Sequence, residues 1–156
     1  MGSSELNLRI DLISFRHYVS TSIGGCGRMG LVKKRESRII GTCRLTNWDP
    51  ESKKAEIGYT LARDHWGHGY ITEAGNQVID YGFRSSELNR IEGMCDAENQ
   101  GSARVMEKAA MSFEGLLSGY GFWKNEYRDI KLFSILRREY FERTRETGMD
   151  SGSHFK

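Results

Sequence analysis

Two glycines one residue apart, Gly67 and Gly69, lie between a strand-like run at residues 55–61 and a helically spaced run that begins at Ile71. In such a connection the first backbone N–H groups of the helix have no intrahelical acceptor and point outwards. Together with the positive end of the helix dipole they favour a phosphate-like anion, and glycine lets a bulky group approach the backbone closely. The spacing therefore predicts a pyrophosphate-binding turn. Gly-x-Gly also occurs in ordinary turns, so the prediction depends on the surrounding elements.

Strands and helices are predicted on both sides of this turn from the spacing of apolar residues. The predicted strands cover residues 28–34, 39–46, 54–61, 90–96, 113–120 and 127–136. Helices are predicted from Ile71 to about Ser86 and from Gln100 to Ala109, the second capped by Asn99. The order is hairpin, strand, glycine turn, helix, strand, helix and hairpin.

The two ends of the chain carry weaker patterns. Within residues 5–20, Leu8, Leu12, Phe15 and Val19 fall at helical spacing, whereas Leu6, Leu8, Ile10 and Leu12 alternate as in a strand. We predict a helix there and keep the strand as the alternative. Residues 137–145 predict a frayed terminal helix, and residues 147–156 predict a disordered tail.

The charged segment 33–38 is predicted to be a solvated hairpin turn, with a basic docking patch as the alternative. Composition sets broader limits on the whole chain of 156 residues. Charged residues make up 28%, apolar residues 38%, and the net charge is +2, which fits one soluble domain and gives no compositional support for nucleic-acid binding. No apolar run approaches ~18 residues, so we expect a cytoplasmic protein without a membrane span.

Cysteine and histidine spacing argues against a metal site. Cys26, Cys43 and Cys95 lie far apart, and no pair has zinc-like or redox spacing. We therefore expect reduced, structural thiols rather than a catalytic one. The histidines show no ligand spacing on a helix face, and no metal is expected.

Four sequence blocks occur in order in the middle of the chain. They read Ala-Glu-Ile-Gly-Tyr at 55–59, Trp-Gly-His-Gly-Tyr at 66–70, Thr-Glu-Ala at 72–74 and Asn-Gln-Gly-Ser-Ala-Arg-Val-Met-Glu-Lys at 99–108. In this order and spacing the chain resembles the GNAT acetyltransferases, and within them the ribosomal-protein alanine/serine N-acetyltransferases of the RimJ/RimL type. The resemblance covers about residues 39–136 and is far more specific than one Gly-x-Gly turn.

The resemblance implies a single GNAT domain over residues 1–146, of the α+β class. Its central sheet is expected to be mostly antiparallel, flanked by helices and splayed where acetyl-CoA inserts. The implied activity is direct transfer of acetyl from acetyl-CoA to a primary amine, most simply the N-terminal α-amine of a protein. A small amine such as a polyamine or an antibiotic, and a non-catalytic CoA-binding module, remain alternatives. A monomer or a homodimer is expected.

Three features depart from the family pattern. Only residues 1–25 precede Cys26, where the family has a strand and two helices of several dozen residues, so the N-terminal part is expected to be shortened. The family's Leu-Gly-Phe after the second helix is Ala-Ala-Met at 109–111, so that helix must close with Ala110 at positive φ or in another way. His68 stands where the family usually has lysine, which makes the phosphate site less permanently charged.

The resemblance places acetyl-CoA between the strands at 56–61 and 90–96. Backbone N–H groups of the turn would hold the pyrophosphate, the edge of the first strand would pair with the pantetheine amides, and an N–H near Leu61 would stabilise the oxyanion. The expected acetyl-CoA-binding residues are Gly58, Tyr59, Thr60, Leu61, Trp66, Gly67, His68, Gly69, Tyr70, Ile71, Asn99, Ser102, Arg104 and Lys108.

Two residues are the expected catalytic groups. Glu56 is the candidate general base, with a solvated strand carboxylate as its alternative role; because an α-amine has a pKa of about 8, a weak base suffices. Ser102 matches the family hydroxyl that reaches the sulfur and protonates the leaving thiolate, but it could also be a routine first-turn helix residue. Asn99 matches the family position that hydrogen-bonds pantetheine, a role compatible with helix capping.

Four further side chains have less specific roles. Arg104 and Lys108 are four residues apart and would share one side of their helix, where they could meet the 3′-phosphate or adenine end of CoA. A solvated helix face explains them equally well. Trp123 and Tyr127 could line the acceptor pocket, although aromatic residues there more often belong to the core.

Overall fold

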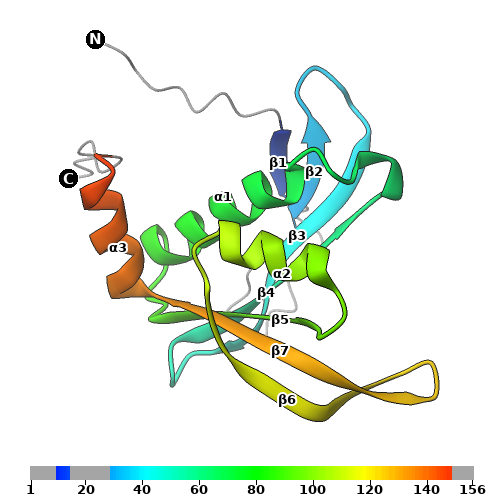
Figure 1. Cartoon of the computed structure of the whole chain (residues 1–156). Coiled ribbons are helices and arrows are strands. Elements are labelled where there is room, and N and C mark those ends of the chain that lie inside the picture. The colour runs from blue at the N-terminus through cyan, green and yellow to red at the C-terminus, as the bar shows by residue number, and fades with distance from the viewer. Residues whose placement is uncertain (1–9, 15–28, 149–156) are drawn as a thin grey trace.

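A seven-stranded sheet in the order β1-β2-β3-β4-β5-β7-β6 organises the molecule. The computed structural model of the chain describes residues 10–14 and 29–148 (Figure 1). The strands are β1 (Ile10–Ser14), β2 (Met29–Lys33), β3 (Ile39–Asp49), β4 (Lys54–Leu61), β5 (Arg90–Asp96), β6 (Ser112–Trp123) and β7 (Glu126–Leu136). The helices are the 3₁₀ turn η1 (Arg63–His65), α1 (Tyr70–Arg84), α2 (Gln100–Lys108) and α3 (Arg137–Glu146).

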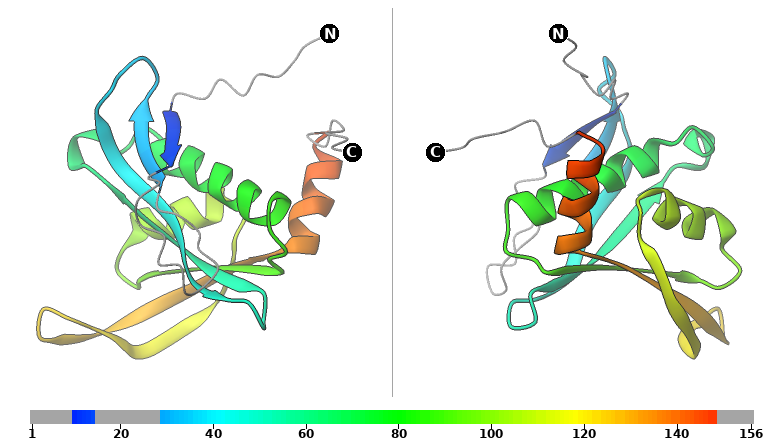
Figure 2. Two further views of the ribbon diagram at one scale, coloured as in Figure 1. Left: turned by 180° about the vertical axis from the view of Figure 1, so that it is seen from behind. Right: turned by 60° about the vertical axis from the view of Figure 1, so that its left-hand side comes forward.

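All neighbouring strands are antiparallel except β4 and β5, which run parallel. Parallel neighbours need a long crossover, and η1 with α1 supplies it. Helices α1 and α2 lie on one face of the sheet, and the β6–β7 hairpin projects away from the rest of the molecule (Figures 1 and 2). The predicted α+β fold with a mostly antiparallel sheet is therefore confirmed.

Helix α1 packs against the middle of the sheet through the predicted stripe. Its buried residues are Ile71, Ala74, Gly75, Val78, Ile79, Gly82 and Phe83. A Cβ added at Gly82 would lie 3.0 Å from Ile91 Cδ1 and 3.1 Å from Leu45 Cδ1. Glycine at this position thus lets the helix backbone approach the sheet closely, as the sequence predicts.

The two weakly patterned ends have different outcomes. Residues 10–14 form strand β1, which pairs with β2, so the predicted helix is wrong there and the alternating pattern was the correct signal. The rest of residues 5–20 lies outside the described residues, as does the predicted tail beyond Gly148. The predicted helix α3 is present, and its Tyr140 is buried against Phe83 with ring centroids 5.3 Å apart. A buried aromatic residue anchors α3 to α1.

Two chain reversals test the predicted ends of their elements. Strand β3 continues to Asp49, beyond the predicted end at residue 46, and Asp49 Oδ1 accepts from the N–H groups of Glu51 and Ser52 at 3.0 and 3.1 Å. The turn therefore begins at Pro50.

At the end of α2, Ala110 adopts φ 59° while Met111 N–H donates to Met106 O at 3.0 Å, which confirms closure with alanine in the left-handed region.

The β6–β7 hairpin corrects one further expectation. The turn lies at Lys124 and Asn125, as predicted, with φ of 50° and 59°. However, Trp123 is 65% exposed and Tyr127 is 76% exposed. These aromatic side chains do not belong to the core, because the hairpin extends beyond the part of the sheet that the helices cover (Figure 2).

Candidate active site

Strands β4 and β5 separate halfway along their length. Their pairing starts at Lys54 with Arg90 and ends at Ile57 with Gly93. Both strands continue beyond this point, β4 to Leu61 and β5 to Asp96, each still paired with its outer neighbour. A gap therefore opens between residues 58–61 and 94–96. The predicted splaying of the two strands is confirmed.

Two residues of β4 turn their backbone groups toward this gap. Ala62 N–H donates to Ile40 O of β3 at 2.8 Å. Because backbone groups alternate in direction along a strand, the N–H groups of Leu61 and Tyr59 point away from β3 and toward the gap, whereas those of Gly58 and Thr60 face β3. Leu61 O accepts from Trp66 Nε1 at 2.8 Å, which agrees with this direction. The edge that a ligand can meet is thus Tyr59 and Leu61.

The glycine turn lies immediately after this edge and leads into α1. Gly67 and Gly69 have φ of 78° and 77°, and Gly69 is the N-cap of α1. Glu73 N–H is the donor to Gly69 O, at 3.1 Å, so the N–H groups before it have no place in the helical ladder. A Cβ added at Gly67 would meet no atom within 4 Å. There is open space beside Gly67, and the unpaired N–H groups of a helix N-terminus suit an anion.

Positive charge and aromatic rings surround the turn. The Arg63 guanidinium lies over the Trp66 ring at 5.4 Å, and the rings of His68 and Tyr70 are 5.5 Å apart. Trp66 and His68 are exposed. Among these groups, Arg63 and the N-terminus of α1 supply a positive potential at neutral pH.

Helix α2 places a hydroxyl pair beside the other side of the gap. Asn99 is its N-cap, and its side chain accepts from Ser102 N–H at 3.0 Å. The hydroxyl oxygens of Tyr59 and Ser102 are 2.6 Å apart, and Tyr59 Oη is also 3.2 Å from Ser102 O. A side chain of β4 is thus linked across the gap to the first turn of α2.

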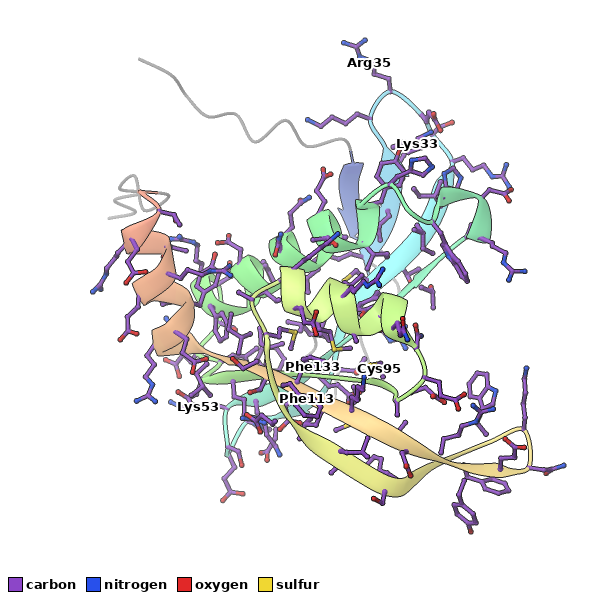
Figure 3. All side chains as sticks on the ribbon, in the orientation of Figure 1. Lys33, Arg35, Lys53, Cys95, Phe113 and Phe133 are labelled. Carbon is purple, nitrogen blue, oxygen red and sulfur yellow. The ribbon has the colours of Figure 1, made fainter. Side chains whose placement is uncertain are left out.

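The Tyr59–Ser102 pair lies in a partly desolvated environment. Burial raises the pKa of Tyr59 to about 12, outweighing the hydrogen bond from Ser102 that lowers it. Cys95 of β5 lies beneath α2 and also interacts with Ser102, and burial raises the pKa of its thiol (Figure 3). Burial likewise raises the pKa of Cys43 to about 12. Both thiols are therefore protonated at neutral pH, consistent with structural roles.

Sequence reasoning missed the side chain of Tyr59. It was expected to contribute only its backbone edge, although the alternation of β4 already placed Tyr59 on the face that α2 covers. The missing information was the tertiary contact between residues 59 and 102.

Glu56 lies on the opposite face of the sheet from this pair. Its carboxylate accepts from Asn47 Nδ2 at 2.8 Å, and it is aligned with Glu92 in the last paired part of β4 and β5. Glu56 is half-buried. The two expected catalytic residues therefore flank the gap from its two sides.

Arg104 and Lys108 are exposed on α2. Their position allows either of the roles expected from the sequence. Within residues 10–14 and 29–148, there is no group of three His, Cys, Asp or Glu side chains that could hold a metal ion. No helix in this part of the chain is both long and apolar enough to cross a membrane.

Comparison with known proteins agrees with this geometry. Residues 13–112 match the family described as an acetyltransferase (GNAT) domain. The chain is 42% identical over 117 residues to the uncharacterized N-acetyltransferase p20 of Bacillus licheniformis, covering 75% of this chain and 66% of that protein. It is 32% identical over 110 residues to the ribosomal-protein-serine acetyltransferase of Escherichia coli, covering 70% and 61%.

Solved structures show the same arrangement. The ribosomal-protein-S5-alanine acetyltransferase of Vibrio fischeri superposes with a TM-score of 0.69 at 27% identity, covering 74% of this chain and 63% of that one. A dodecameric spermidine N-acetyltransferase of Vibrio cholerae superposes with a TM-score of 0.71 at 25% identity, covering 78% and 70%. The chain therefore belongs to the GNAT acetyltransferase family. It spans less than two thirds of the length of the first relatives named.

Proposed function

We propose that this protein is an acetyl-CoA-dependent N-acetyltransferase that acts on the N-terminal α-amine of a protein. The observation that carries the proposal is the gap between β4 and β5, which has an outward strand edge on one side, a hydroxyl pair at its helix face and an anion-binding turn at its end. From its acyl end, acetyl-CoA has a thioester, the pantetheine amides and a pyrophosphate, which correspond to the hydroxyl pair, the strand edge and the turn. The residues present thus suit this co-substrate.

The pyrophosphate would lie on the N–H groups of residues 66–71, at the start of α1. The outward backbone groups of the strand edge, the C=O of Tyr59 and the N–H of Leu61, would pair with the pantetheine amides in the way that a strand pairs with an extended peptide. Asn99 would add a hydrogen bond to pantetheine from the start of α2. Arg104 and Lys108 are proposed to meet the phosphorylated adenosine end.

The reaction needs no covalent enzyme intermediate. The amine nitrogen attacks the thioester carbonyl carbon, the C–S bond breaks, and an amide and a thiol leave. The thioester lies beyond the pantetheine amides from the pyrophosphate, so the N–H of Tyr59, which is farther from the turn than Leu61, is the proposed donor to the oxyanion. The Ser102 hydroxyl is the proposed donor to the departing sulfur. Glu56 is proposed to receive the amine proton from the opposite face of the sheet. The α-amine has a pKa of about 8, so this step is not demanding near neutral pH.

The acceptor is proposed from the relatives. A ribosomal-protein-serine acetyltransferase and a ribosomal-protein alanine acetyltransferase are both among them, which supports a protein N-terminus. A spermidine N-acetyltransferase is also among them, so a polyamine is the competing acceptor. The cytoplasm is the proposed compartment, because Cys43 and Cys95 are free thiols and a reducing compartment maintains that state.

The first test is calorimetric titration with acetyl-CoA, followed by thiol release in the presence of N-terminal peptides or small amines. A matched pair of glycine variants sharpens it. Gly67 and Gly119 both have positive φ, and neither has an atom within 4 Å of an added Cβ. Alanine costs about 1 kcal/mol of backbone strain at either position. We expect Gly67→Ala to weaken acetyl-CoA binding about tenfold by crowding the anion site, and Gly119→Ala to leave it unchanged.

Three results would count against the proposal. Absence of acetyl-CoA binding would remove the cofactor assignment. Binding without thiol release on any amine would indicate a CoA-binding module. Equal loss of affinity in the two glycine variants would assign the effect to stability rather than to the turn.

A further inference from the structure

Arg44 lies at the point where β4 and β5 separate, on the face of the sheet that α1 and α2 do not cover. It pairs with Gly58, the first residue of β4 beyond the closed part. A Cβ added at Gly58 would lie 3.4 Å from Cζ, Nε and Nη2 of Arg44. The glycine therefore lets the guanidinium lie across the β4 backbone at the mouth of the gap.

The charge of Arg44 is not paired within the part of the chain that the structure describes. Among the described residues it forms no ion pair with a carboxylate, although it is half-buried. Its neighbours Thr42 and Thr60 on this face are uncharged and hydrogen-bond each other at 2.9 Å. Half-buried guanidinium groups usually have a carboxylate or phosphate partner.

Of the carboxylates on this face, two are paired with cations and one is not. Glu92 is bound by Arg90 at 2.8 Å, and Glu114 is bound by the same guanidinium at 2.7 and 2.9 Å. Lys54 adds a further contact to Glu92 at 4.0 Å. Those two carboxylates are thus neutralised. Glu56 is bound only by the neutral amide of Asn47, at 2.8 Å, so its charge is not compensated by that contact.

The chain that joins β1 to β2 adds no negative charge. Residues 15–28 lie outside the described residues, but their sequence contains Arg16, His17 and Arg28 and neither aspartate nor glutamate. Whatever its conformation, this connection cannot supply a carboxylate to Arg44. Among the described residues, Glu56 therefore supplies a negative charge and Arg44 a positive charge at the mouth of the gap on this face.

We propose that the acceptor carries a negative charge close to its amine, with the amine directed to Glu56 and the anionic group to Arg44. This inference rests on the proposed acetyltransferase function and specifies its substrate class. Glu56 and Gly58 are two residues apart on one strand, so the two charges lie about 7 Å apart along it. The anion is a carboxylate, either the α-carboxylate of a free amino acid or an acidic side chain near a peptide N-terminus.

The same arrangement disfavours a polyamine. The other two nitrogens of spermidine are protonated near neutral pH, so spermidine would place a further cation beside Arg44. Like charges at short range in a partly desolvated site are repulsive. Arg44 therefore separates the two acceptor classes that the relatives leave open.

The test compares acceptors that differ only in charge. Thiol release is measured with the peptide amides Ser-Asp-Ala, Ser-Asn-Ala and Ser-Lys-Ala, with serine against serinamide, and with spermidine. The proteins are the wild type, Arg44→Gln and Arg44→Lys, with Arg35→Gln as the control. Arg35 is exposed at the tip of the β2–β3 turn and carries the same charge (Figure 3).

We expect kcat/KM of the wild type to be about tenfold higher for the aspartate peptide than for the asparagine peptide, as for a charge-assisted hydrogen bond. Arg44→Gln should bring this ratio close to one and raise kcat/KM for spermidine. Arg44→Lys should keep part of the preference, and Arg35→Gln all of it. The comparison of serine with serinamide identifies the source of the carboxylate. If serine is preferred over serinamide and the peptides show no preference, the acceptor is a free amino acid.

An unchanged ratio in Arg44→Gln, or a wild-type preference for the lysine peptide or spermidine, would overturn the inference. Binding of the same peptides to the CoA-saturated protein is measured in parallel. If no acceptor is acetylated, the proposed function fails. The role of Arg44 is then decided by binding alone: the wild type should bind the aspartate peptide more tightly than the asparagine peptide, and Arg44→Gln should bind both equally. Absence of that preference in binding would overturn it as well.

Discussion

The two halves of the β4–β5 pair have the same neighbours but opposite properties. In the half from Lys54 to Ile57 the strands are hydrogen-bonded to each other, and Ala55 and Ile91 are buried in the core between them and α1. In the half that begins at Gly58 the strands are apart. The backbone N–H and C=O groups of β4 that would have bonded to β5 are directed into the gap instead. The proposed acetyl-CoA site therefore lies where the pairing of the two parallel strands stops.

Side chains reinforce this difference. Arg90 clamps Glu92 and Glu114 at the closed end, across β5 and β6. At the open end a contact of 2.6 Å between the Tyr59 and Ser102 hydroxyls joins β4 to α2 in place of β5. The closed half should therefore govern stability, and the open half should govern turnover. Variants in each half can therefore separate effects on stability from effects on turnover.

The largest expected effect is on stability, from Ile91→Ala in the closed half. Ile91 is fully buried, and its removal leaves a cavity beneath α1. We expect the free energy of unfolding to fall by about 3 to 4 kcal/mol. Chemical denaturation measures it, and acetyl-CoA affinity of the remaining folded protein should be unchanged. A loss below about 1 kcal/mol would show that the closed half is not the stabilising one.

Ser102→Ala in the open half should act on turnover instead. It removes the proposed donor to the departing sulfur, and we expect kcat to fall about a hundredfold. Asn99 keeps its bond to the N–H of residue 102, so the unfolding free energy and the acetyl-CoA dissociation constant should change little. Steady-state thiol release and calorimetry test this together. An unchanged kcat would remove Ser102 from the mechanism.

Tyr59→Phe should have a smaller effect of the same kind. The phenol positions the Ser102 hydroxyl, and without it that hydroxyl samples other directions; we expect kcat to fall about tenfold. The pKa of about 12 for Tyr59 is well above that of a thiol, at about 8.5, so the pair should stabilise the thiolate by hydrogen bonding rather than by net proton transfer.

The double variant distinguishes positioning from an independent role. If Tyr59 acts through Ser102, adding Tyr59→Phe to Ser102→Ala should cost no further activity. A further tenfold loss in the double variant would contradict the positioning role. If Tyr59→Phe instead raises KM about tenfold and leaves kcat unchanged, the substitution disturbs the structure of the site and not the positioning of the Ser102 hydroxyl.

The smallest expected effect is the pH-dependent contribution of Glu114 at the closed end. Arg90 lowers the pKa of Glu114 from 4.5 to about 2. Because the folded pKa lies below the unfolded one, the stabilisation is complete above about pH 5 and is lost as the pH falls toward 2. The side chain is 39% exposed, so solvent screens the pair, and Glu114→Gln should cost no more than about 1 kcal/mol at pH 7.

Unfolding free energies of the wild type and Glu114→Gln, measured between pH 7 and pH 3, provide the check. Their difference should shrink below about pH 4. A difference that grows on acidification would mean that the ion pair does not lower the pKa of Glu114.

Much of this fold could be predicted from the sequence because its elements have strong local signals. The stripe of α1, the Asn99 cap and the closure of α2 at Ala110 each depend on residues within one turn of the feature. Strand β1 was mistaken for a helix because its short apolar run satisfies both periods. Its pairing with β2 decides the matter, and pairing is not a local property.

The candidate site was also predictable only in its local features. The glycine turn is local, and its place in the chain was found. The contact between Tyr59 and Ser102 joins residues 43 positions apart, and the approach of Arg44 to Gly58 depends on the register of β3 with β4. Strand alternation indicates the faces, but only the assembled sheet shows which side chains meet. Those two contacts carry the positioning and the specificity proposed for this protein.

Amide hydrogen exchange within β4, with and without acetyl-CoA, tests the central claim most directly. The N–H groups of Ile57, Tyr59 and Leu61 all point toward β5, but only Ile57 lies in the closed half. We predict slow exchange at Ile57 in both states, and exchange at Tyr59 and Leu61 that is fast alone and slow with saturating acetyl-CoA. Exchange at Tyr59 and Leu61 that is unaffected by acetyl-CoA would contradict the assignment of the gap as its binding site.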